Sequence, residues 1–307
     1  MSEPIKFQGL RGELRDNEPM SRHVSWRAGG PARRFFAPAD LEDLSVFLPQ
    51  LPEEEPVLFV GLGSNLLVRE GGWRGTVVLM YGAARAPRMD EGLLYAEAGV
   101  ACPKVARFAA DQNLGSAEFL TGIPGTVGGA LAMNAGCYGG ETWDIVERVV
   151  TINRRGQLRR RGKEEFEFGY RHLELKSDVP SDGDEWFASA HFKLPEGDRE
   201  ESREIMKALL SKRRASQPLQ LPNAGSVFRN PPEGKTAARL IQQSGLKKLA
   251  RGGARISEKH ANFIVNPGGA GSASDIEWLI LEVQKRVEEE KGVRLVTEVK
   301  IVGEESA

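Results

Sequence analysis

Residues 119–141 read FLTGIPGTVGGALAMNAGCYGGE, and seven of them are glycine. Small residues such as Ala130, Ala132 and Thr126 fill many of the other positions. Side chains this small make a poor hydrophobic core, but they let the backbone approach a flat or anionic ligand closely. The stretch therefore predicts one wall of a ligand site. A packing interface between small residues is the alternative.

Another glycine stretch comes first along the chain, where residues 56–70 read PVLFVGLGSNLLVRE. We call residues 56–70 the first glycine stretch and residues 119–141 the second. A strand-like run leads there into Gly61 and Gly63. A Rossmann fingerprint would need a third glycine at position 66 and a long helix after it, but the chain has Leu66 and then Gly71. The Rossmann fold is therefore excluded. Two glycine loops that both follow strand-like runs predict a site for a dinucleotide diphosphate, whereas a tight turn without a ligand remains the alternative for the first loop alone.

The predicted cofactor-binding residues come from these two stretches. They are Gly61, Leu62, Gly63, Ser64, Asn65, Leu66, Thr121, Gly122, Ile123, Pro124, Gly125, Thr126, Gly128, Gly129, Ala132, Asn134, Ala135 and Gly136.

The 307 residues suffice for two or three domains. Apolar periodicity predicts helices over residues 40–48, 102–115, 201–216, 234–245 and 274–292. Strand-like runs occupy residues 56–61, 76–80, 93–100, 146–160, 185–194, 260–266 and 293–303. Helices and strands are intermixed without regular alternation, so the pattern favours an α+β fold over a doubly wound parallel sheet.

Local signals predict where several of these elements begin and end. Ser274 and Glu277 predict a capping box for the last helix, and Gly292 predicts its end. Ser202 and Thr236 are the expected N-caps of two other helices. The polar run SDVPSDGDE, residues 177–185, predicts an exposed hairpin loop. The apolar stripe of the last helix comprises Ile276, Leu279, Ile280, Val283 and Val287.

Composition excludes several function classes. The net charge is −1, from 42 basic and 43 acidic residues, so nothing indicates nucleic acid or an anionic membrane as a partner. The two cysteines, Cys102 and Cys137, are too few for a disulfide framework and are expected to serve packing. The four histidines lack metal-ligand spacing, and no metal is expected. The N-terminus MSEPIKFQGL lacks the apolar core of a signal peptide, so a cytoplasmic enzyme or binding protein is expected.

Two further stretches remain ambiguous when read locally. In NAGSVFRNP, residues 223–231, the hydroxyl of Ser226 is either a turn residue or a reagent. In VRLVTEVKIV, residues 293–302, alternation places Glu298 and Lys300 together on the face opposite an apolar one. By pattern alone, that face is a solvated surface with a weak ion pair.

Five motifs in a fixed order carry a resemblance to a known family. They are GLGSNLLV, FLTGIPGTVGGALAMNAG, FGYR, NAGSVFRNP and LVTEVKIVG, and they cover nearly the whole chain. In this combination the chain closely resembles the UDP-N-acetylenolpyruvoylglucosamine reductases, in the branch that lacks an extra tyrosine loop. The resemblance implies a vanillyl-alcohol-oxidase (PCMH) type FAD-binding domain and a smaller C-terminal α+β substrate domain. The implied division is 1–82 and 83–196 for two FAD-binding subdomains and 197–307 for the substrate domain.

The activity that the resemblance implies is that of UDP-N-acetylmuramate dehydrogenase, an oxidoreductase and flavoprotein with noncovalent FAD and NADPH. It would reduce UDP-N-acetylglucosamine enolpyruvate to UDP-N-acetylmuramate for peptidoglycan synthesis, and so serve cell wall biogenesis, cell shape, cell division and the cell cycle. Hydride would reach the enolpyruvyl β-carbon, and Ser226 would protonate the α-carbon. The implied partners are small molecules only, with no nucleic acid, membrane or protein partner.

The resemblance also assigns roles to single residues. Ser226, Arg171 of FGYR and Glu298 match the family's catalytic serine, arginine and glutamate. Without the tyrosine loop, Arg229, Lys300 or His260 is expected to replace its clamp on the substrate diphosphate. The expected substrate-binding residues are Tyr170, Arg213, Arg229, Asn230, His260 and Lys300.

Two other functions compete with this reductase. One is an FAD-dependent sugar or alcohol oxidase on the same scaffold, although the loop GLGSNLL lacks the histidine through which such oxidases often tether their flavin. The other is a nucleotide-sugar or flavin sensor, which would bind its ligand without turnover.

Overall fold

The computed structural model describes residues 6–82 and 84–305, which form two compact units. Unit 1 contains the described residues of Met1–Arg15, Arg34–Gly61 and Gly75–Leu209, and unit 2 those of Asp16–Arg33, Leu62–Arg74 and Leu210–Ala307. Unit boundaries fall inside strands β1 (Glu13–Pro19), β2 (Pro31–Ala37) and β5 (Trp73–Leu79) and inside helix α5 (Arg199–Ser216). The three-segment division expected from the sequence stays a prediction. The first five residues of the N-terminal stretch lie outside the described residues.

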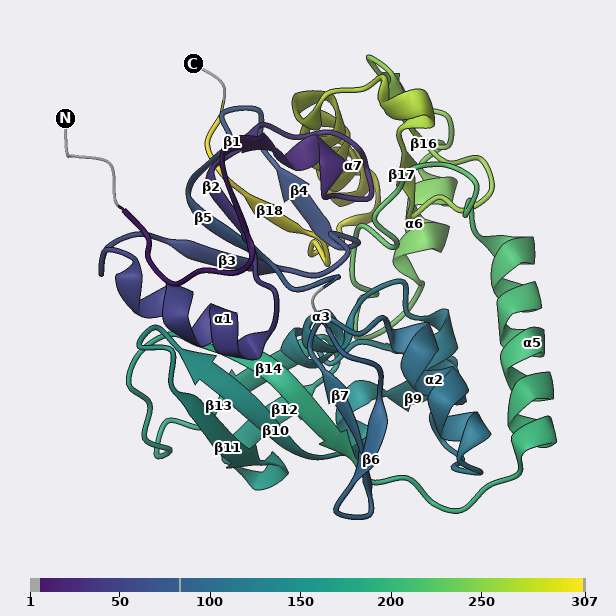
Figure 1. The fold of residues 1–307 in the computed structure, drawn as a ribbon. Helices are drawn as coiled ribbons and strands as arrows, with labels where there is room; N and C mark the ends of the chain where they lie inside the picture. Colours follow the sequence, from purple (N-terminus) through teal and green to yellow (C-terminus); the bar gives the residue numbers. More distant parts are fainter. Residues whose placement is uncertain (1–5, 83, 306–307) are drawn as a thin grey trace. The chain divides into compact units, whose positions relative to one another are not determined.

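Unit 1 is built on an antiparallel five-stranded sheet. Its strand order is β11 (Leu158–Gly162), β10 (Val146–Asn153), β14 (Glu185–Phe192), β7 (Leu93–Glu97) and β6 (Arg88–Asp90). In Figure 1 the strands β10, β11 and β14 are teal to green, and the strands β6 and β7 are blue. The predicted run 146–160 is thus a hairpin of two strands. Strand β3 (Val57–Val60) pairs in parallel with β5.

Two hydrophobic clusters fill unit 1. The first surrounds helices α2 (Cys102–Asp111) and α3 (Val127–Ala132) and includes the fully buried Trp143. The second surrounds helix α1 (Leu41–Phe47), where Phe36 and Phe47 stack with ring centroids 4.0 Å apart. Burial of the Cys102 thiol in the first cluster raises its pKa to about 12, as expected for a packing cysteine.

Unit 2 packs around the long helix α7 (Ala273–Lys291) and the short α6 (Ala237–Gln243). Its strands are β15 (Ala250–Arg251), β16 (Ala254–Ile256) and β17 (Ile264–Val265) in one sheet, and β4 (Leu66–Val68) parallel to β18 (Lys300–Val302). The five predicted stripe residues of α7 are all buried, and Gly292 ends the helix at φ 66°. The mixed, non-alternating elements confirm the α+β prediction.

Two predicted helix caps were wrong. Helix α7 is capped by Ser272 and Asp275, two residues before the predicted Ser274 and Glu277. The Ser272 hydroxyl accepts from the Asp275 N–H at 3.0 Å, and the Asp275 carboxylate accepts from the Ser272 N–H at 3.0 Å. Glu277 is instead engaged by Arg69 at 2.7 Å.

The second wrong cap belongs to α5, which begins before the predicted Ser202. Asp198 accepts from the Glu201 N–H at 2.8 Å, while the Ser202 hydroxyl donates to Glu118 at 2.5 Å. Thr236 is the N-cap of α6, as predicted.

Three strand and loop predictions were too long or misplaced. Of residues 260–266 only Ile264–Val265 are in a strand, and of residues 293–303 only Lys300–Val302 are. Residues 177–185 are not a hairpin loop, because they connect strands of different sheets. The hairpin pairs β12 (Phe166–Gly169) with β13 (His172–Leu175).

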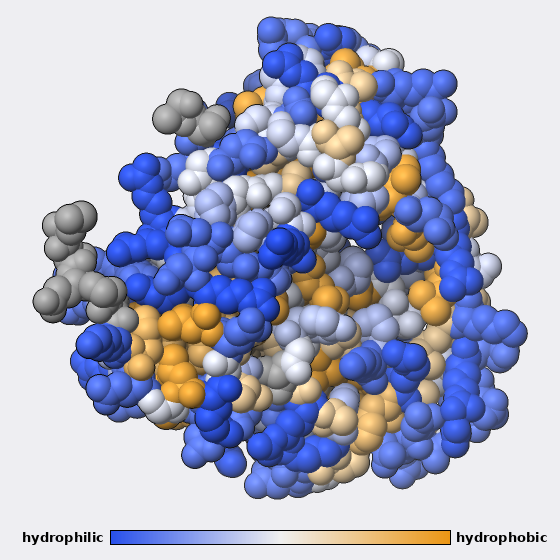
Figure 2. Space-filling view, turned by 45° about the horizontal axis from the view of Figure 1, so that its top comes forward, coloured by the Kyte–Doolittle hydropathy of each residue, from blue (hydrophilic) through white to orange (hydrophobic). Residues whose placement is uncertain are grey.

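Hydrophilic side chains predominate on the face of the molecule drawn in Figure 2, with smaller apolar areas between them. Among the described residues, the large apolar side chains with the greatest exposure belong to different segments: Leu158 in β11, Leu281 in α7 and Val296 before β18. Within residues 6–82 and 84–305, no helix is both long and apolar enough to cross a membrane.

Candidate active site

The backbone beside Ser226 connects it to Glu298 within unit 2. Ser226 is half-buried in the segment between α5 and α6. The N–H of the next residue, Val227, donates to the carbonyl of Asn262 at 2.9 Å, and the Val227 carbonyl accepts from the Glu298 N–H at 2.8 Å. Phe228 forms a further bridge with Thr297. The structure therefore places two of the three predicted catalytic residues on neighbouring backbone segments that are hydrogen-bonded to each other.

Glu298 lies in an extended segment that leads into β18. The predicted alternation holds, since Leu295 and Val299 are buried whereas Val296 and Lys300 are exposed. Glu298 itself is half-buried, so it is not a fully solvated surface residue. This segment lies directly beside the first glycine stretch. The Asn65 amide donates to the Glu298 carbonyl at 3.1 Å, and the Lys300 N–H donates to the Asn65 carbonyl at 3.0 Å.

The glycines of the first stretch are required by the protein's own packing. A Cβ on Gly61 would lie 2.2 Å from the Thr126 hydroxyl in unit 1. In unit 2, Gly63 has φ +59°, and a Cβ there would lie 2.2 Å from the His23 carbonyl. Both distances are far below van der Waals contact. A ligand was the expected reason for these glycines, and packing is a second reason.

The second glycine stretch folds in unit 1 as the 3₁₀ helix η3 (Glu118–Gly122), then α3, then the paired two-residue strands β8 (Gly136–Cys137) and β9 (Gly140–Glu141). Pro124, Gly129 and Ala132 are exposed. The nearest atom to a Cβ placed on Gly129 is the Thr126 hydroxyl oxygen at 3.9 Å. Exposed backbone without bulky side chains fits a flat cofactor, so these residues fit FAD.

Arg171 lies in unit 1, in the two-residue turn between β12 and β13, at a left-handed φ of 54°. Its guanidinium donates to the Gly136 carbonyl at 2.8 Å and to the Asn134 carbonyl at 3.3 Å. The side chain is thus attached to the end of the second glycine stretch, the predicted cofactor wall.

Asn134 was predicted to bind the cofactor, but its side chain is fully buried. Its amide donates to the Gly169 carbonyl at 3.0 Å and to Glu141 at 2.9 Å, and it accepts from the Trp143 N–H at 3.0 Å. Because Gly169 begins the turn that carries Arg171, Asn134 supports that turn. This role was not predicted from the sequence.

Four predicted substrate-binding residues have contacts that define their positions. The Tyr170 ring is exposed in unit 1, with the Arg171 guanidinium carbon 5.0 Å from its centroid. In unit 2, Arg213 donates to Gln217 at 2.8 Å, and the Asn230 carboxamide oxygen accepts from the Ala237 N–H at 3.1 Å. The exposed Lys300 is placed by its backbone bond to Asn65.

Arg229 and His260 each bury a nitrogen that lacks a hydrogen-bond partner among the described residues, Nε of Arg229 and Nδ1 of His260. Burial lowers the pKa of His260, and the positive charge of Lys247 lowers it further. His260 is therefore neutral at pH 7, and it could contact a diphosphate through one N–H but not through a net charge. Buried polar atoms without partners are uncommon, which makes both side chains candidates for a ligand.

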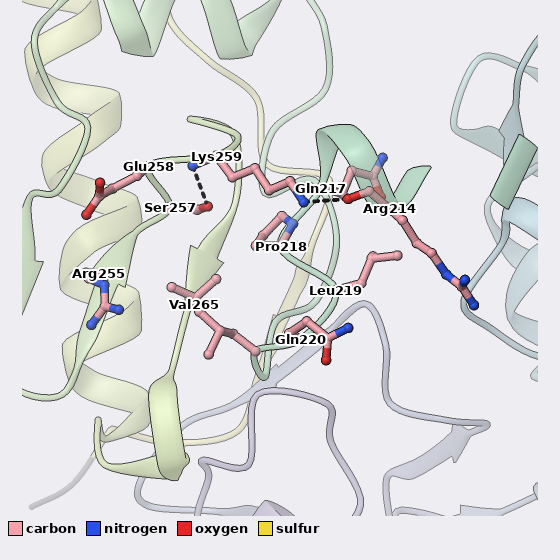
Figure 3. Close-up of a pocket in the computed structure, with 11 residues that line it drawn as sticks. Arg214, Gln217, Pro218, Leu219, Gln220, Arg255, Ser257, Glu258, Lys259 and Val265 are labelled. Atoms are coloured by element: carbon pink, nitrogen blue, oxygen red, sulfur yellow. Dashed lines mark hydrogen bonds between the residues drawn. The ribbon is translucent and has the colours of Figure 1, made fainter. Parts of the chain in front are cut away.

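A pocket of about 400 Å³ in unit 2 lies next to some of these residues in sequence (Figure 3). Its lining includes Arg214, which directly follows Arg213 in the sequence, and Lys259, which directly precedes His260. The Lys259 ammonium bonds to the Arg214 carbonyl, and Glu258 pairs with Lys248 at 3.4 Å. In Figure 3 the Arg214 guanidinium points away from Ser257. This pocket therefore contains no converging catalytic groups.

Comparison with known proteins identifies the family. Residues 217–302 match the family model for the C-terminal domain of UDP-N-acetylenolpyruvoylglucosamine reductase, and residues 32–162 match an FAD-binding domain. The UDP-N-acetylenolpyruvoylglucosamine reductase of Nitrosospira multiformis is 55% identical over 318 residues, covering 97% of this chain and 91% of the relative. The chain belongs to this family.

Other reductases of this name agree. That of Legionella pneumophila strain Paris is 50% identical over 96% of this chain and 95% of its own length. The crystal structure of the reductase from Thermus caldophilus has a TM-score of 0.76 and 33% identity, and covers 95% of this chain and 99% of that one. The expected fold class, a PCMH-type FAD-binding domain with a C-terminal substrate domain, is thereby confirmed.

Most of the predicted site residues fall in one or the other of the two matched regions. The FAD-binding match includes both glycine stretches, and the C-terminal match includes Ser226, Glu298 and Lys300. Arg171 lies between the two regions. Among the described residues, no group of three His, Cys, Asp or Glu side chains is placed to hold a metal ion.

Asn262 is a buried residue of the C-terminal match that was not predicted from the sequence. The available signal was an asparagine inside the apolar run HANFIVN, which was interpreted only as a strand.

Proposed function

We propose that this chain is a UDP-N-acetylmuramate dehydrogenase. It uses NADPH and FAD to reduce UDP-N-acetylglucosamine enolpyruvate to UDP-N-acetylmuramate in peptidoglycan precursor synthesis. Family membership over nearly the full length supports the reaction. The observation that carries the mechanism is the pair of backbone hydrogen bonds at Val227, which hold Ser226 and Glu298 in one arrangement.

FAD, when bound, supplies the hydride that reaches the enolpyruvyl β-carbon. Negative charge then develops toward the substrate carboxylate. Arg171 stabilises this charge, because its planar guanidinium binds a carboxylate bidentately and keeps its proton. Its two bonds to backbone carbonyls hold the guanidinium in place before the substrate arrives.

Ser226 transfers its hydroxyl proton to the α-carbon. A serine hydroxyl is a weak acid, so neighbouring donors such as Lys300, Asn230 or backbone N–H groups must stabilise the alkoxide. Glu298, in the same hydrogen-bonded arrangement, is the ionisable residue that we assign to restoring the proton. Positioned general acids are typically worth about 10²–10⁴-fold in rate.

The remaining assignments belong to the same proposal. The eighteen residues predicted from the two glycine stretches form the FAD site, except that Asn134 acts through its carbonyl and its support of the Arg171 turn. Arg229 and His260 each have a buried nitrogen without a hydrogen-bond partner among the described residues. These two side chains bind the substrate diphosphate in place of the extra tyrosine loop. Residues 1–82 and 83–196 serve FAD, and residues 197–307 serve the substrate. The reaction needs only small molecules and takes place in the cytoplasm.

Anaerobic stopped-flow measurements on Ser226→Ala test the mechanism. We expect flavin reduction by NADPH at nearly the wild-type rate, and reoxidation by the enolpyruvyl substrate slowed about 10²–10⁴-fold. The exposed Ser216 in α5 provides a matched control as Ser216→Ala, which should leave both steps unchanged. Wild-type reoxidation in Ser226→Ala would overturn the role of Ser226. Rapid reoxidation by air with a hydroxylated substrate would instead support the oxidase alternative.

A further inference from the structure

The Asn262 side chain holds the backbone that directly follows Ser226. Asn262 is buried, and its carboxamide oxygen accepts from the Phe228 N–H at 3.0 Å while its amide donates to the Phe228 carbonyl at 2.8 Å. Its main-chain carbonyl also accepts from the Val227 N–H at 2.9 Å. One residue thus makes three hydrogen bonds to two consecutive residues.

The chemistry of this contact requires a carboxamide. A carboxamide carries a donor and an acceptor side by side, as a peptide group does, so Asn262 takes the place of a neighbouring strand for Phe228. Aspartate would offer acceptors only when ionised, and leucine would offer neither group. Because Phe228 is itself buried, loss of the carboxamide would leave its N–H and carbonyl without partners.

The opposite side of the same two residues is bonded to the segment that carries Glu298. The Val227 carbonyl accepts from the Glu298 N–H, and Phe228 bridges to Thr297. Val227 and Phe228 are therefore fixed from two sides, by Asn262 and by residues 297–298. If one side is released, Ser226 can shift relative to Glu298, and a misplacement of about 1 Å can cost about 10²-fold in rate.

We infer that Asn262 is a positioning residue for the reduction, which fixes Ser226 for proton transfer by bonding both backbone groups of Phe228. The inference rests on the proposed role of Ser226. It assigns Asn262 no contact with substrate or cofactor.

Asn266, four residues later, provides a matched control. It is also fully buried, and its carboxamide also bonds backbone on both sides, to the Trp26 carbonyl at 2.9 Å and to the Gly271 carbonyl and N–H at 3.0 and 2.7 Å. None of these bonds involves residues 226–228 or 298. Asn262→Asp and Asn266→Asp therefore damage equivalent buried contacts, but only the first adjoins Ser226.

The experiment measures both half-reactions, flavin content and melting temperature in Asn262→Asp, Asn266→Asp, Ser226→Ala and the double variant Asn262→Asp with Ser226→Ala. We expect both aspartate variants to have a lower melting temperature than wild type. Their rates of flavin reduction by NADPH should stay within about twofold of the wild-type rate. Reoxidation by substrate should slow about 10²-fold in Asn262→Asp only. In the double variant it should be no slower than in Ser226→Ala alone, because Asn262 acts through Ser226.

Three outcomes overturn the inference: wild-type reoxidation in Asn262→Asp, equal slowing in Asn266→Asp, or further slowing in the double variant. If Asn262→Asp does not retain flavin, the same measurements are made on Asn262→Ser, which removes the paired amide without adding charge. The same three outcomes would then overturn the inference. Wild-type reoxidation in Ser226→Ala would overturn the proposed function itself. A slow Ser226→Ala beside a fast Asn262→Asp would reject the positioning role alone.

Discussion

Arg171 illustrates how one residue is prepared for chemistry at a cost to the fold. Its φ of 54° lies in a region that side chains other than glycine and asparagine rarely adopt, and such conformations cost about 1–3 kcal/mol. The cost is tolerated because the guanidinium bonds two carbonyls and Asn134 holds the turn. Strained residues of this kind concentrate at functional sites.

Arg171→Lys should therefore slow catalysis far more than it lowers stability. Lysine has the same φ strain but loses the guanidinium contact with two carbonyls, so the melting temperature should fall by about 2–4 °C. The planar fork is lost, and reoxidation of the reduced flavin by substrate should slow about 10²–10³-fold. Stopped-flow absorbance measures this step. Arg107→Lys, at an exposed position on α2, is the control. An equal loss in both variants would contradict a specific role for Arg171.

Helix α7 shows what local pattern can and cannot specify about an element. The apolar stripe and Gly292 correctly predicted the buried face and the end of the helix. The start was misplaced because Ser272 with Asp275 and Ser274 with Glu277 both fit a capping box. Distant residues decide between them: Arg69 engages Glu277, and the Glu70 carboxylate accepts from the Ala273 N–H. Neither contact can be read from a local window.

The two serines give a direct test of this start. Ser272→Ala should lower the free energy of unfolding by about 1 kcal/mol, because the Asp275 N–H loses its acceptor. Ser274→Ala, at an exposed position inside the helix, should change it by less than about 0.5 kcal/mol. Urea unfolding followed by circular dichroism measures both. A larger effect at Ser274 would restore the cap predicted from the sequence.

At the scale of the whole molecule, unit 2 includes residues that the sequence gives no reason to group. Residues 16–33 and 62–74 belong with the C-terminal third of the chain. The Trp26 indole donates to the Ile264 carbonyl at 2.7 Å, across 238 positions. Periodicity predicted the α+β class, the five longer helices and part of the strands, whereas β1, β2, β12 and β13 were not predicted. The site residues taken from the family motifs stay predictions. Periodicity in a local window cannot predict which distant segments bond to each other. For the same reason Asn262 was mistaken for a strand residue.

Binding of FAD should raise the free energy of unfolding of the whole protein. FAD at about 100 times its dissociation constant should raise the free energy of unfolding by about 2.7 kcal/mol. Gly129→Leu should lose most of this gain, because its side chain would project into the open space at the proposed cofactor wall. Thermal unfolding of both proteins with and without FAD tests this. The apoproteins should melt at similar temperatures, and an undiminished FAD shift in Gly129→Leu would remove Gly129 from the site.

The close contacts at Gly61 and Gly63 bear on attempts to redesign this enzyme. A side chain at either position would collide with Thr126 or with the His23 carbonyl before any cofactor is present. A saturation library at these two codons, screened for altered flavin preference, would mostly return insoluble protein. Its low hit rate would reflect assembly of the polypeptide, and diversity is better placed elsewhere in the loop.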